Sequence, residues 1–138
     1  MPKLSPIPDD VDRPHLEAAN EDRLVLQYCT ADDRWQYPPG PTCGACRSAD
    51  HLEWRETDGA GTIYSYAVVH HTYLAALKDE LPFNAAVIEL DNAPGVNFFT
   101  RLPGSAPGDV PIGAKVRITF ESTPGTGQKV PEWVLVAS

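Results

Sequence analysis

The sequence has few of the features that mark a membrane-spanning or secreted protein. No apolar run approaches the roughly 18 residues that a transmembrane helix needs. The opening MPKLSPIPDDVDRP has no apolar stretch and several acids, unlike a secretory signal. Only 3 cysteines are present, which argues against a disulfide framework. We therefore expect a cytoplasmic protein that does not enter a membrane, with cysteines that are thiols or metal ligands.

Positive charge is also scarce. The chain has 11 Lys and Arg residues against 19 Asp and Glu residues, and its net charge is −8. Nucleic-acid affinity rests largely on Lys and Arg side chains that neutralise phosphates. The acidic balance therefore argues against DNA or RNA as a partner.

Catalytic motifs are missing as well. The chain has no G-x-S-x-G nucleophile motif, and its carboxylates are scattered without the spacing of an acid–base pair. His70 and His71 are neighbours at the end of an expected strand, where their side chains would point to opposite faces. Gly59-Ala60-Gly61 lacks the remaining glycines and the helix of a dinucleotide-binding loop, and we interpret it as a flexible hinge. No catalytic residue is predicted.

Prolines and glycines, by contrast, are frequent, with 14 and 10 residues. They indicate short strands and many turns. The second half alternates apolar and polar residues, most clearly in Lys115–Glu121. Five short strands in about 75 residues match a small, partly open barrel of the OB-fold type. The expected strands are 62–69, 85–90, 96–102, 115–121 and 132–136.

The first half is expected to begin with a helix. Asp12-Arg13-Pro14 is typical of a helix start, with Asp12 as the cap, and the helix is predicted over His15–Asp22. It is too short and polar to be stable alone, so it must pack on another surface. Strands are predicted at Arg23–Tyr28 and Leu52–Glu56.

All three cysteines lie in CTADDRWQYPPGPTCGAC, residues 29–46. Cys43 and Cys46 form a C-x-x-C knuckle that can chelate a metal. A zinc ribbon needs a second knuckle about 15 residues away, where the chain offers Cys29 and Asp32. Asp33 and His51 are alternative fourth ligands. Three interpretations stay open: zinc on Cys29, Asp32, Cys43 and Cys46, a ribbon without its metal, or three unrelated thiols.

The expected organisation is mostly β. A flexible lead covers residues 1–11, a helix and zinc-ribbon-like module covers 12–58, and a five-stranded OB-fold domain covers 59–138. Four aromatic residues in the second half could form a stacking face, although alternation should place half of them in the core. They are Tyr64, Tyr66, Phe98 and Phe99.

The order of these features resembles a known family. It is the acyl-CoA-associated zinc-ribbon/OB-fold family, first catalogued as a domain of unknown function, and the resemblance covers roughly residues 12–136. The motifs that carry it are LVLQYC at 24–29, YPP at 37–39, C-x-x-C at 43–46, LEW at 52–54, GAGTIYSY at 59–66, PFNAAVIELD at 82–91 and IGAKVRITF at 112–120.

The resemblance implies a rubredoxin-like zinc ribbon joined to an OB-fold. It also implies a non-catalytic accessory subunit of a thiolase-like enzyme, in some cases beside a MaoC-type hydratase, that helps bind or channel acyl-CoA in degradation or acyl-transfer pathways. Family members usually have four cysteines, and this chain has Asp32 at one of the four positions. The docking surfaces we expect are the helix at 15–22, the segment 73–81, where Leu74, Leu77 and Leu81 predict a helical turn, and the exposed aromatics.

Two other functions remain as alternatives. The first is a single-stranded nucleic-acid-binding zinc-ribbon/OB module, which the acidic composition disfavours. The second is a small stand-alone enzyme that acts on thioesters and uses His70 or His71.

Overall fold

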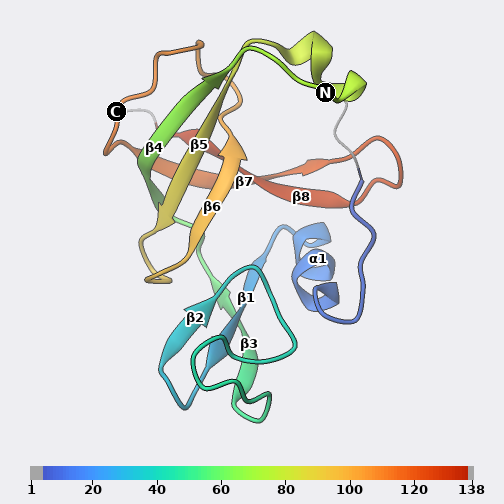
Figure 1. The fold of residues 1–138 in the computed structure, drawn as a ribbon, viewed down its shortest axis with the longest axis vertical. Coiled ribbons are helices and arrows are strands. Elements are labelled where there is room, and N and C mark those ends of the chain that lie inside the picture. The colour runs from blue at the N-terminus through green and yellow to red at the C-terminus, as the bar shows by residue number, and fades with distance from the viewer. Residues whose placement is uncertain (1–4, 137–138) are drawn as a thin grey trace.

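The computed structural model describes residues 5–136 and all of their side chains except that of Ala76 (Figure 1). Its strands form two antiparallel sheets: a ribbon in the order β2-β1-β3 and a barrel sheet in the order β6-β5-β4-β7-β8. The mostly-β prediction with one short helix at the N-terminal side is confirmed. The elements are α1 Arg13–Asn20, β1 Leu24–Cys29, β2 Arg34–Gln36, β3 Leu52–Thr57, β4 Gly61–Val69, the 3-10 helix η1 Ala75–Glu80, β5 Phe83–Leu90, β6 Asn97–Arg101, β7 Lys115–Ser122 and β8 Lys129–Leu135.

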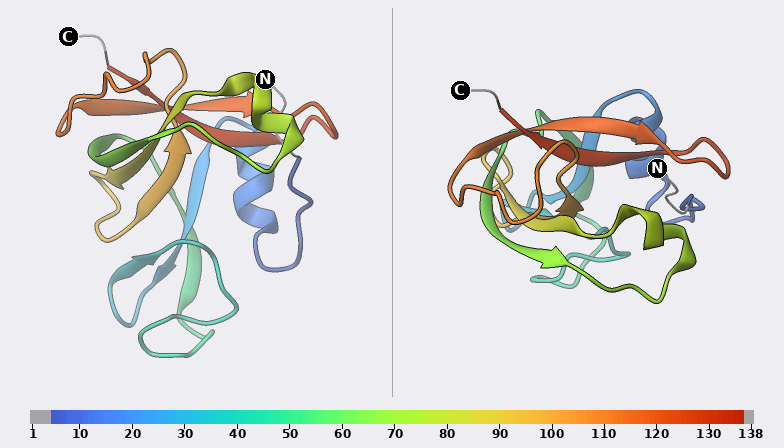
Figure 2. Two further views of the ribbon diagram at one scale, coloured as in Figure 1. Left: turned by 45° about the horizontal axis from the view of Figure 1, so that its top comes forward. Right: turned by 90° about the horizontal axis from the view of Figure 1, so that it is seen from above.

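The barrel sheet confirms the OB-fold, and it is not closed. Its edge strands β6 and β8 share no hydrogen-bonded ladder. Instead Phe98 of β6 and Trp133 of β8 face each other with ring centroids 4.7 Å apart. Figure 2 shows how the sheet curls, so that β7 and β8 cross over β4, β5 and β6. Side-chain packing therefore replaces backbone pairing at the seam.

The ribbon contains a strand that the sequence did not predict. β2 is only 3 residues long and pairs with β1 from Gln27↔Gln36 to Cys29↔Arg34. The chain reverses between the two strands through Asp33, which has a positive φ of 50°. Aspartate tolerates this left-handed conformation better than most residues. A strand this short and polar has too little alternation to be recognised from sequence.

The first residues of the helix differ from the prediction. α1 begins at Arg13, and Asp12 occupies the N-cap position without a side-chain cap hydrogen bond. Its carboxylate instead accepts a hydrogen bond from the backbone N–H of Asp9 at 2.8 Å. β8 also begins earlier than the expected Glu132 and includes Pro131. Proline is tolerated there because β8 is an edge strand, so the missing N–H interrupts no inner ladder.

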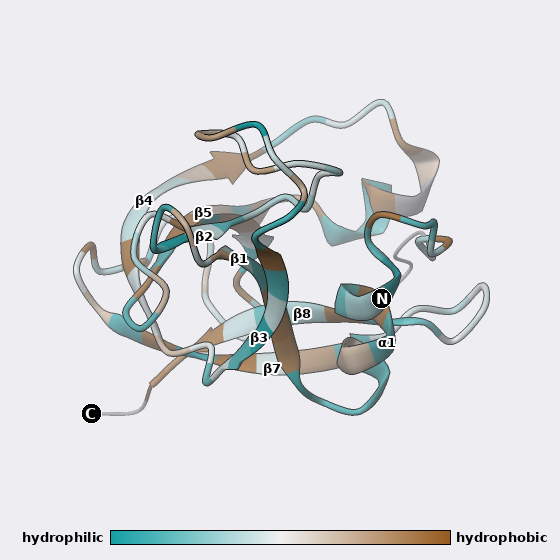
Figure 3. Cartoon of the chain, turned by 90° about the horizontal axis from the view of Figure 1, so that it is seen from below, coloured by the Kyte–Doolittle hydropathy of each residue, from teal (hydrophilic) through white to brown (hydrophobic). Residues whose placement is uncertain are grey.

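The helix packs on its own chain. Its buried face consists of His15, Leu16, Ala18 and Ala19. Gln128, at the tip of the β7–β8 hairpin, donates a hydrogen bond to the Leu16 carbonyl at 2.8 Å. The view from the ribbon end in Figure 3 shows both hydrophilic and hydrophobic residues on α1. β1 and β8 of the same chain already cover the apolar side of α1, so the helix does not need a partner protein for stability. Its short length is therefore not a reason to expect it at an interface.

The linker between ribbon and barrel is part of the core and not the flexible hinge that we expected. Gly59 has a φ of +74°, and a Cβ there would lie 2.8 Å from Ile118. At Gly61 a Cβ would lie 2.5 Å from Ile88. The Gly59 carbonyl accepts a hydrogen bond from the buried Trp133 indole at 2.8 Å. Both glycines are therefore required by close packing.

A single hydrophobic cluster joins ribbon and barrel. Leu24 and Leu26 of β1 belong to the same buried cluster as Trp133 and the inner side chains of the barrel sheet. Tyr37, which follows β2, stacks on Phe98 of β6 with a centroid distance of 4.1 Å. The two modules therefore share one core.

The N-terminal lead is attached to the barrel at Ser5. Its hydroxyl donates to Thr123 Oγ1 at 2.7 Å and accepts a hydrogen bond from the Thr126 N–H at 3.0 Å. Residues 1–4 of the expected lead lie outside the described residues. Within residues 5–136, no helix is long and apolar enough to cross a bilayer.

Candidate metal centre

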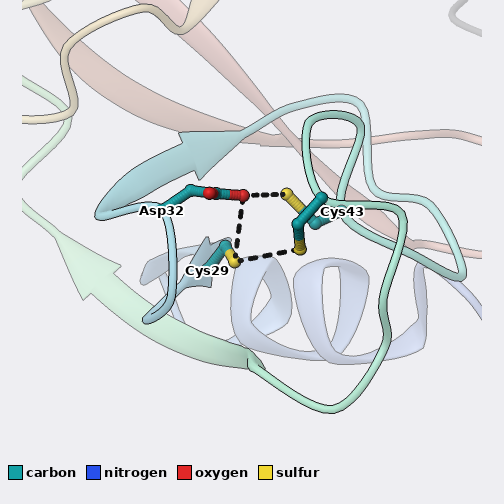
Figure 4. A group of neighbouring side chains, drawn as sticks. Cys29, Asp32 and Cys43 are labelled. Atoms are coloured by element: carbon teal, nitrogen blue, oxygen red, sulfur yellow. Dashed lines mark hydrogen bonds between the residues drawn. The ribbon is translucent and has the colours of Figure 1, made fainter.

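Four side chains at the ribbon tip converge on one point. Figure 4 shows Cys29 at the end of β1, Asp32 in the turn into β2 and Cys43 in the loop between β2 and β3. Cys46 lies in the same loop. One ligand atom from each of the four lies within 4.8 Å of every other. The structure thus brings together all four residues that we predicted as metal ligands, and three unrelated thiols can be excluded.

The spacing within the cluster fits a tetrahedral zinc. Zn–S bonds of about 2.3 Å give a tetrahedron with edges of about 3.8 Å, and a Zn–O bond is slightly shorter. The sulfurs of Cys29 and Cys46 are 3.8 Å apart. The Asp32 carboxylate lies 3.7 Å from the Cys29 sulfur and 3.3 Å from the Cys43 sulfur. Three thiolates and one carboxylate are an acceptable zinc ligand set, so the residues fit the ion.

The C-x-x-C knuckle is shaped by backbone hydrogen bonds. The Ala45 N–H donates to the Cys43 sulfur at 3.4 Å. Around it, the Arg47 N–H donates to the Cys43 carbonyl at 2.8 Å and the Cys43 N–H donates to the Ser48 carbonyl at 3.0 Å. The Ala45 N–H stabilises negative charge on the Cys43 sulfur, which a metal-bound thiolate carries, and the other two hydrogen bonds fix the backbone of the knuckle.

Two glutamines that our sequence interpretation missed hold the knuckle loop against the ribbon. The Gln27 side chain makes two hydrogen bonds to the backbone of Gly40, at 2.8 and 2.9 Å. Gln36 accepts from the Gly44 N–H at 2.8 Å and donates to the Thr42 carbonyl at 3.0 Å. The two glutamines also bond to each other at 2.9 Å. A buried polar residue in the otherwise apolar LVLQYC strand was the only sequence signal for this network.

The pKa values of the ligands reflect their mutual contacts. Hydrogen bonds from the thiols, first that of Cys43, lower the pKa of Asp32 below its ordinary value. The N–H groups of Cys46 and Ala45 lower the pKa of Cys43. At Cys46 the Ser48 backbone acts to lower the pKa, but desolvation and contacts with Asp32, Cys29 and Cys43 outweigh it and raise the pKa to about 11. Zinc must therefore displace the Cys46 proton when it binds at neutral pH.

The other candidate residues lie apart from the cluster. Asp33 and His51 do not belong to the group of converging ligand atoms within the described chain. His70 and His71 directly follow the end of β4, and both are exposed. His15 is buried, and its Nδ1 lies 3.0 Å from the Val25 carbonyl. Burial lowers the pKa of His15, which favours the neutral ring in a structural role.

Ribbon, barrel and cysteine cluster together define a zinc-ribbon/OB-fold protein. Comparison with family models agrees with this class. Residues 16–51 match the model described as the rubredoxin-like zinc ribbon domain of ChsH2, and residues 54–121 match the C-terminal OB-fold domain of ChsH2.

Three known proteins are similar to this chain, and the part of each protein that is matched differs. A solved chain described as "Ltp2-ChsH2(DUF35) aldolase" is 32% identical, with a TM-score of 0.80, over 96% of this chain and 99% of that one. A "probable enoyl-CoA hydratase alpha subunit" of Thermomonospora curvata is 41% identical over 103 residues. A "DUF35 domain-containing scaffold protein" of Methanocaldococcus jannaschii is 32% identical over 87 residues. The chain spans 30% and 57% of the length of these two curated relatives.

The chain belongs to the DUF35 family and has the ribbon and OB-fold domains of its ChsH2-type members. A DUF35 protein of unknown function from Sulfolobus solfataricus, at 18% identity and a TM-score of 0.59, shares the fold. The resemblance inferred from the sequence is therefore confirmed.

Removing the Gln36 side chain should weaken zinc binding. In Gln36→Ala the Gly44 N–H and Thr42 carbonyl lose their partner, so the knuckle is no longer fixed before the metal binds. We expect the affinity for zinc to fall about 10- to 100-fold, the usual effect of losing an outer-shell contact. A competition titration with a chromophoric chelator measures it.

The control is Gln128→Ala, which removes another hydrogen-bonded glutamine, far from the cluster at the contact between α1 and the barrel. That variant should lose stability and keep its zinc affinity. Equal zinc affinity of Gln36→Ala and the wild type would show that the glutamine network does not organise the site.

Proposed function

We propose that the chain is a non-catalytic accessory subunit of a thiolase-like enzyme that acts on acyl-CoA. In this proposal a zinc ion bound by Cys29, Asp32, Cys43 and Cys46 stabilises the ribbon. The observation that carries the proposal is the likeness, over nearly the full length of both chains, to the ChsH2(DUF35) aldolase chain. The scaffold and hydratase-subunit names of the two curated relatives support the same role.

The distribution of reactive groups supports a role without catalysis. The three thiols are gathered in the metal cluster, where zinc would bind them as thiolates. His15 is buried, and His71 packs edge-on against Tyr73 with a centroid distance of 4.9 Å. Nucleophilic catalysis needs a nucleophile within hydrogen-bond reach of a base. Among the described residues, the cysteines and histidines offer no such pair.

The charge distribution indicates which subunit would bind the phosphates of CoA. Those phosphates require Lys and Arg side chains, whereas this chain has a net charge of −8. Several of its basic residues are also engaged in ion pairs. We therefore infer that the partner supplies most of the positive charge and that this chain contacts less charged parts of the substrate or only the partner. The ion pairs are Arg23 with Glu21 and Glu56, Arg55 with Glu53, Arg101 with Glu80, Lys115 with Asp91, and Lys129 with Asp22.

The outer face of the barrel sheet is the docking surface that we favour. A β-bulge between Ile63 and Ser65 turns Tyr64 outward, and Tyr64 is 65% exposed. Phe99 on β6 pairs with Val87 of β5 and is 86% exposed. Val87 in turn pairs with Ser65, the residue after Tyr64, so Phe99 and the bulge that carries Tyr64 lie on opposite sides of β5. Exposed aromatic residues on neighbouring strands of one sheet are typical of protein interfaces.

The segment before η1 offers a second exposed group. Tyr73 is 94% exposed and Leu74 is 50% exposed, immediately before the 3-10 helix η1. The helical turn predicted here is confirmed as η1, and the two apolar side chains just before it are exposed to solvent. This segment adds to the surface available to a partner.

The double substitution Tyr64→Ser and Phe99→Ser should abolish co-purification with the partner. Interface aromatics each contribute on the order of 2 kcal/mol, so losing both should weaken binding at least 100-fold. The measurement is a pull-down after co-expression with a thiolase-like protein from the same organism, followed by titration of the purified subunits.

Ile112→Ser provides the control, because Ile112 is also a large exposed apolar residue, at 60%, outside β4–β6. If the double variant still binds the partner, the interface lies on another surface of the chain. The proposed function fails if the wild-type chain stays monomeric beside that thiolase-like protein and the enzyme reaches its full rate without it.

A further inference from the structure

The four ligands of the metal cluster are not equally protected from solvent. The side chains of Cys29 and Cys43 are completely buried, whereas Asp32 and Cys46 are exposed. A bound ion would therefore be enclosed on the side of the two buried thiolates and accessible on the side of the carboxylate. Structural zinc sites are usually closed, and sites that react keep an accessible position.

Asp32 is also held less firmly than Cys43. Cys43 lies in a knuckle fixed by backbone N–H groups and by the Gln36 network. The hydrogen bonds of the Asp32 carboxylate within the described chain all come from thiols of the cluster itself. A carboxylate that binds a metal normally has an outer-shell donor that orients it. Among residues 5–136, no group outside the cluster donates a hydrogen bond to the Asp32 carboxylate. Asp32 also lies in a turn and not in a strand.

We propose that Asp32 is the exchangeable ligand of the zinc site and that a small exogenous thiol can take its place. The inference rests on the zinc site proposed above. Thiolate is a softer ligand than carboxylate, and zinc bound by three thiolates favours a fourth. Both ligands carry one negative charge, so the exchange does not change the net charge of the centre and has no large electrostatic cost.

The exchange is balanced without an oxidant. The Zn–O bond to Asp32 breaks and a Zn–S bond to the incoming sulfur forms. The thiol loses its proton to solvent, and Asp32 leaves as a free carboxylate. Zinc keeps its charge and four ligands throughout, and the bound thiol is held as a thiolate at neutral pH.

The ligand is identified by its chemistry as an unhindered primary thiol. A metabolite such as coenzyme A and a simple thiol such as 2-mercaptoethanol share this group. They differ in charge, because the phosphates of coenzyme A would meet an acidic protein of net charge −8. Comparing the two therefore separates recognition of the sulfur from recognition of the rest of the molecule.

Cobalt(II) substitution of the full-length chain tests the exchange directly. Thiolate-to-cobalt charge-transfer absorption grows with the number of bound thiolates. Adding 2-mercaptoethanol or coenzyme A should raise this absorption in wild type by about one third, because the number of bound thiolates rises from three to four. Asp32→Cys is the matched control: it should show the higher absorption from the start and not respond to thiol. Asp32→Ala should respond at a lower thiol concentration than wild type, because no carboxylate competes.

A second readout uses the zinc-loaded chain and does not depend on colour. Native mass spectrometry should detect one thiol per zinc-bound wild-type chain and none on Asp32→Cys. The S-methyl derivative of coenzyme A, which cannot form a thiolate, should not bind. Half-saturation at a lower concentration with coenzyme A than with 2-mercaptoethanol would identify coenzyme A as the preferred source.

The outcomes separate this inference from the function proposed above. Normal cobalt absorption that does not change with thiol overturns the exchange and leaves the metal site intact. Removal of the metal by thiol, seen as bleaching with cobalt in the filtrate, also overturns it. Failure of cobalt or zinc to bind at all would instead refute the metal site. Loss of partner binding is measured separately and bears only on the accessory role.

Discussion

Replacing Cys29 with serine should remove stoichiometric zinc from the chain and unfold the ribbon tip. Cys29 is fully buried at the end of β1, and its backbone pairs with Arg34 of β2 and Leu52 of β3. In small zinc modules the metal supplies about 10–16 kcal/mol of folding free energy. The loop that carries Cys43 and Cys46 contains no strand or helix, so only the metal and the hydrogen bonds of the Gln27–Gln36 network fix it. Zinc content by atomic emission and the thermal unfolding temperature measure the effect.

The same experiment includes a variant expected to act in the opposite direction. Asp32→Cys completes a set of four thiolates, so it should keep its zinc and resist chelators better than wild type. The core shared by ribbon and barrel should leave the barrel of Cys29→Ser folded but less stable. A Cys29→Ser chain that retains one zinc and the wild-type unfolding temperature would show that Cys29 is not a ligand.

Trp133→Ala should be the most destabilising substitution in the barrel. Trp133 is completely buried, packs on Phe98 across the open seam, and donates a hydrogen bond to the Gly59 carbonyl. Truncating a buried tryptophan to alanine costs about 3–5 kcal/mol. That is a large part of the stability of an ordinary domain. Chemical denaturation followed by circular dichroism measures the loss.

Trp133→Phe separates the contribution of the ring from that of the hydrogen bond. Phenylalanine retains most of the packing but leaves the Gly59 carbonyl without its donor, which costs about 1–3 kcal/mol. Zinc content should be unchanged in both variants, because Trp133 lies in the barrel sheet and not at the ribbon tip. If Trp133→Ala were as stable as the wild type, the seam between β6 and β8 would not depend on side-chain packing.

The strands of the barrel were predictable because each has one buried face. β7 has the clearest alternation of apolar and polar residues in the sequence, and its observed range Lys115–Ser122 extends the prediction by one residue. β2 was not predicted, since three residues beside a turn carry no periodic signal. The start of β8 was also misplaced, because Pro131 signals a break and only the position of β8 at a sheet edge makes it acceptable.

The orientation of the aromatic residues depended on tertiary structure. Strict alternation would place Tyr64 and Tyr66 on the same face of β4. The bulge at Tyr64 shifts the register, so Tyr64 is exposed while Tyr66 packs against the core and donates a hydrogen bond to the Gly108 carbonyl. A bulge depends on the pairing of two strands distant in sequence, which a single sequence does not reveal.

By itself, the sequence determined the class of fold, the family and the identity of the residues that can bind a metal. The fold class follows from local alternation and turn residues, and the candidate metal ligands follow from the cysteine spacing. The family follows from the resemblance that the ordered motifs carry. Only the tertiary structure decided that Cys29 and Asp32 meet that knuckle, that Asp33 and His51 do not, and that Asp32 lies on the exposed side of the cluster. The reason is geometric: the β1–β2 turn and the pairing of β1 with β3 set these distances, and both depend on contacts across the chain.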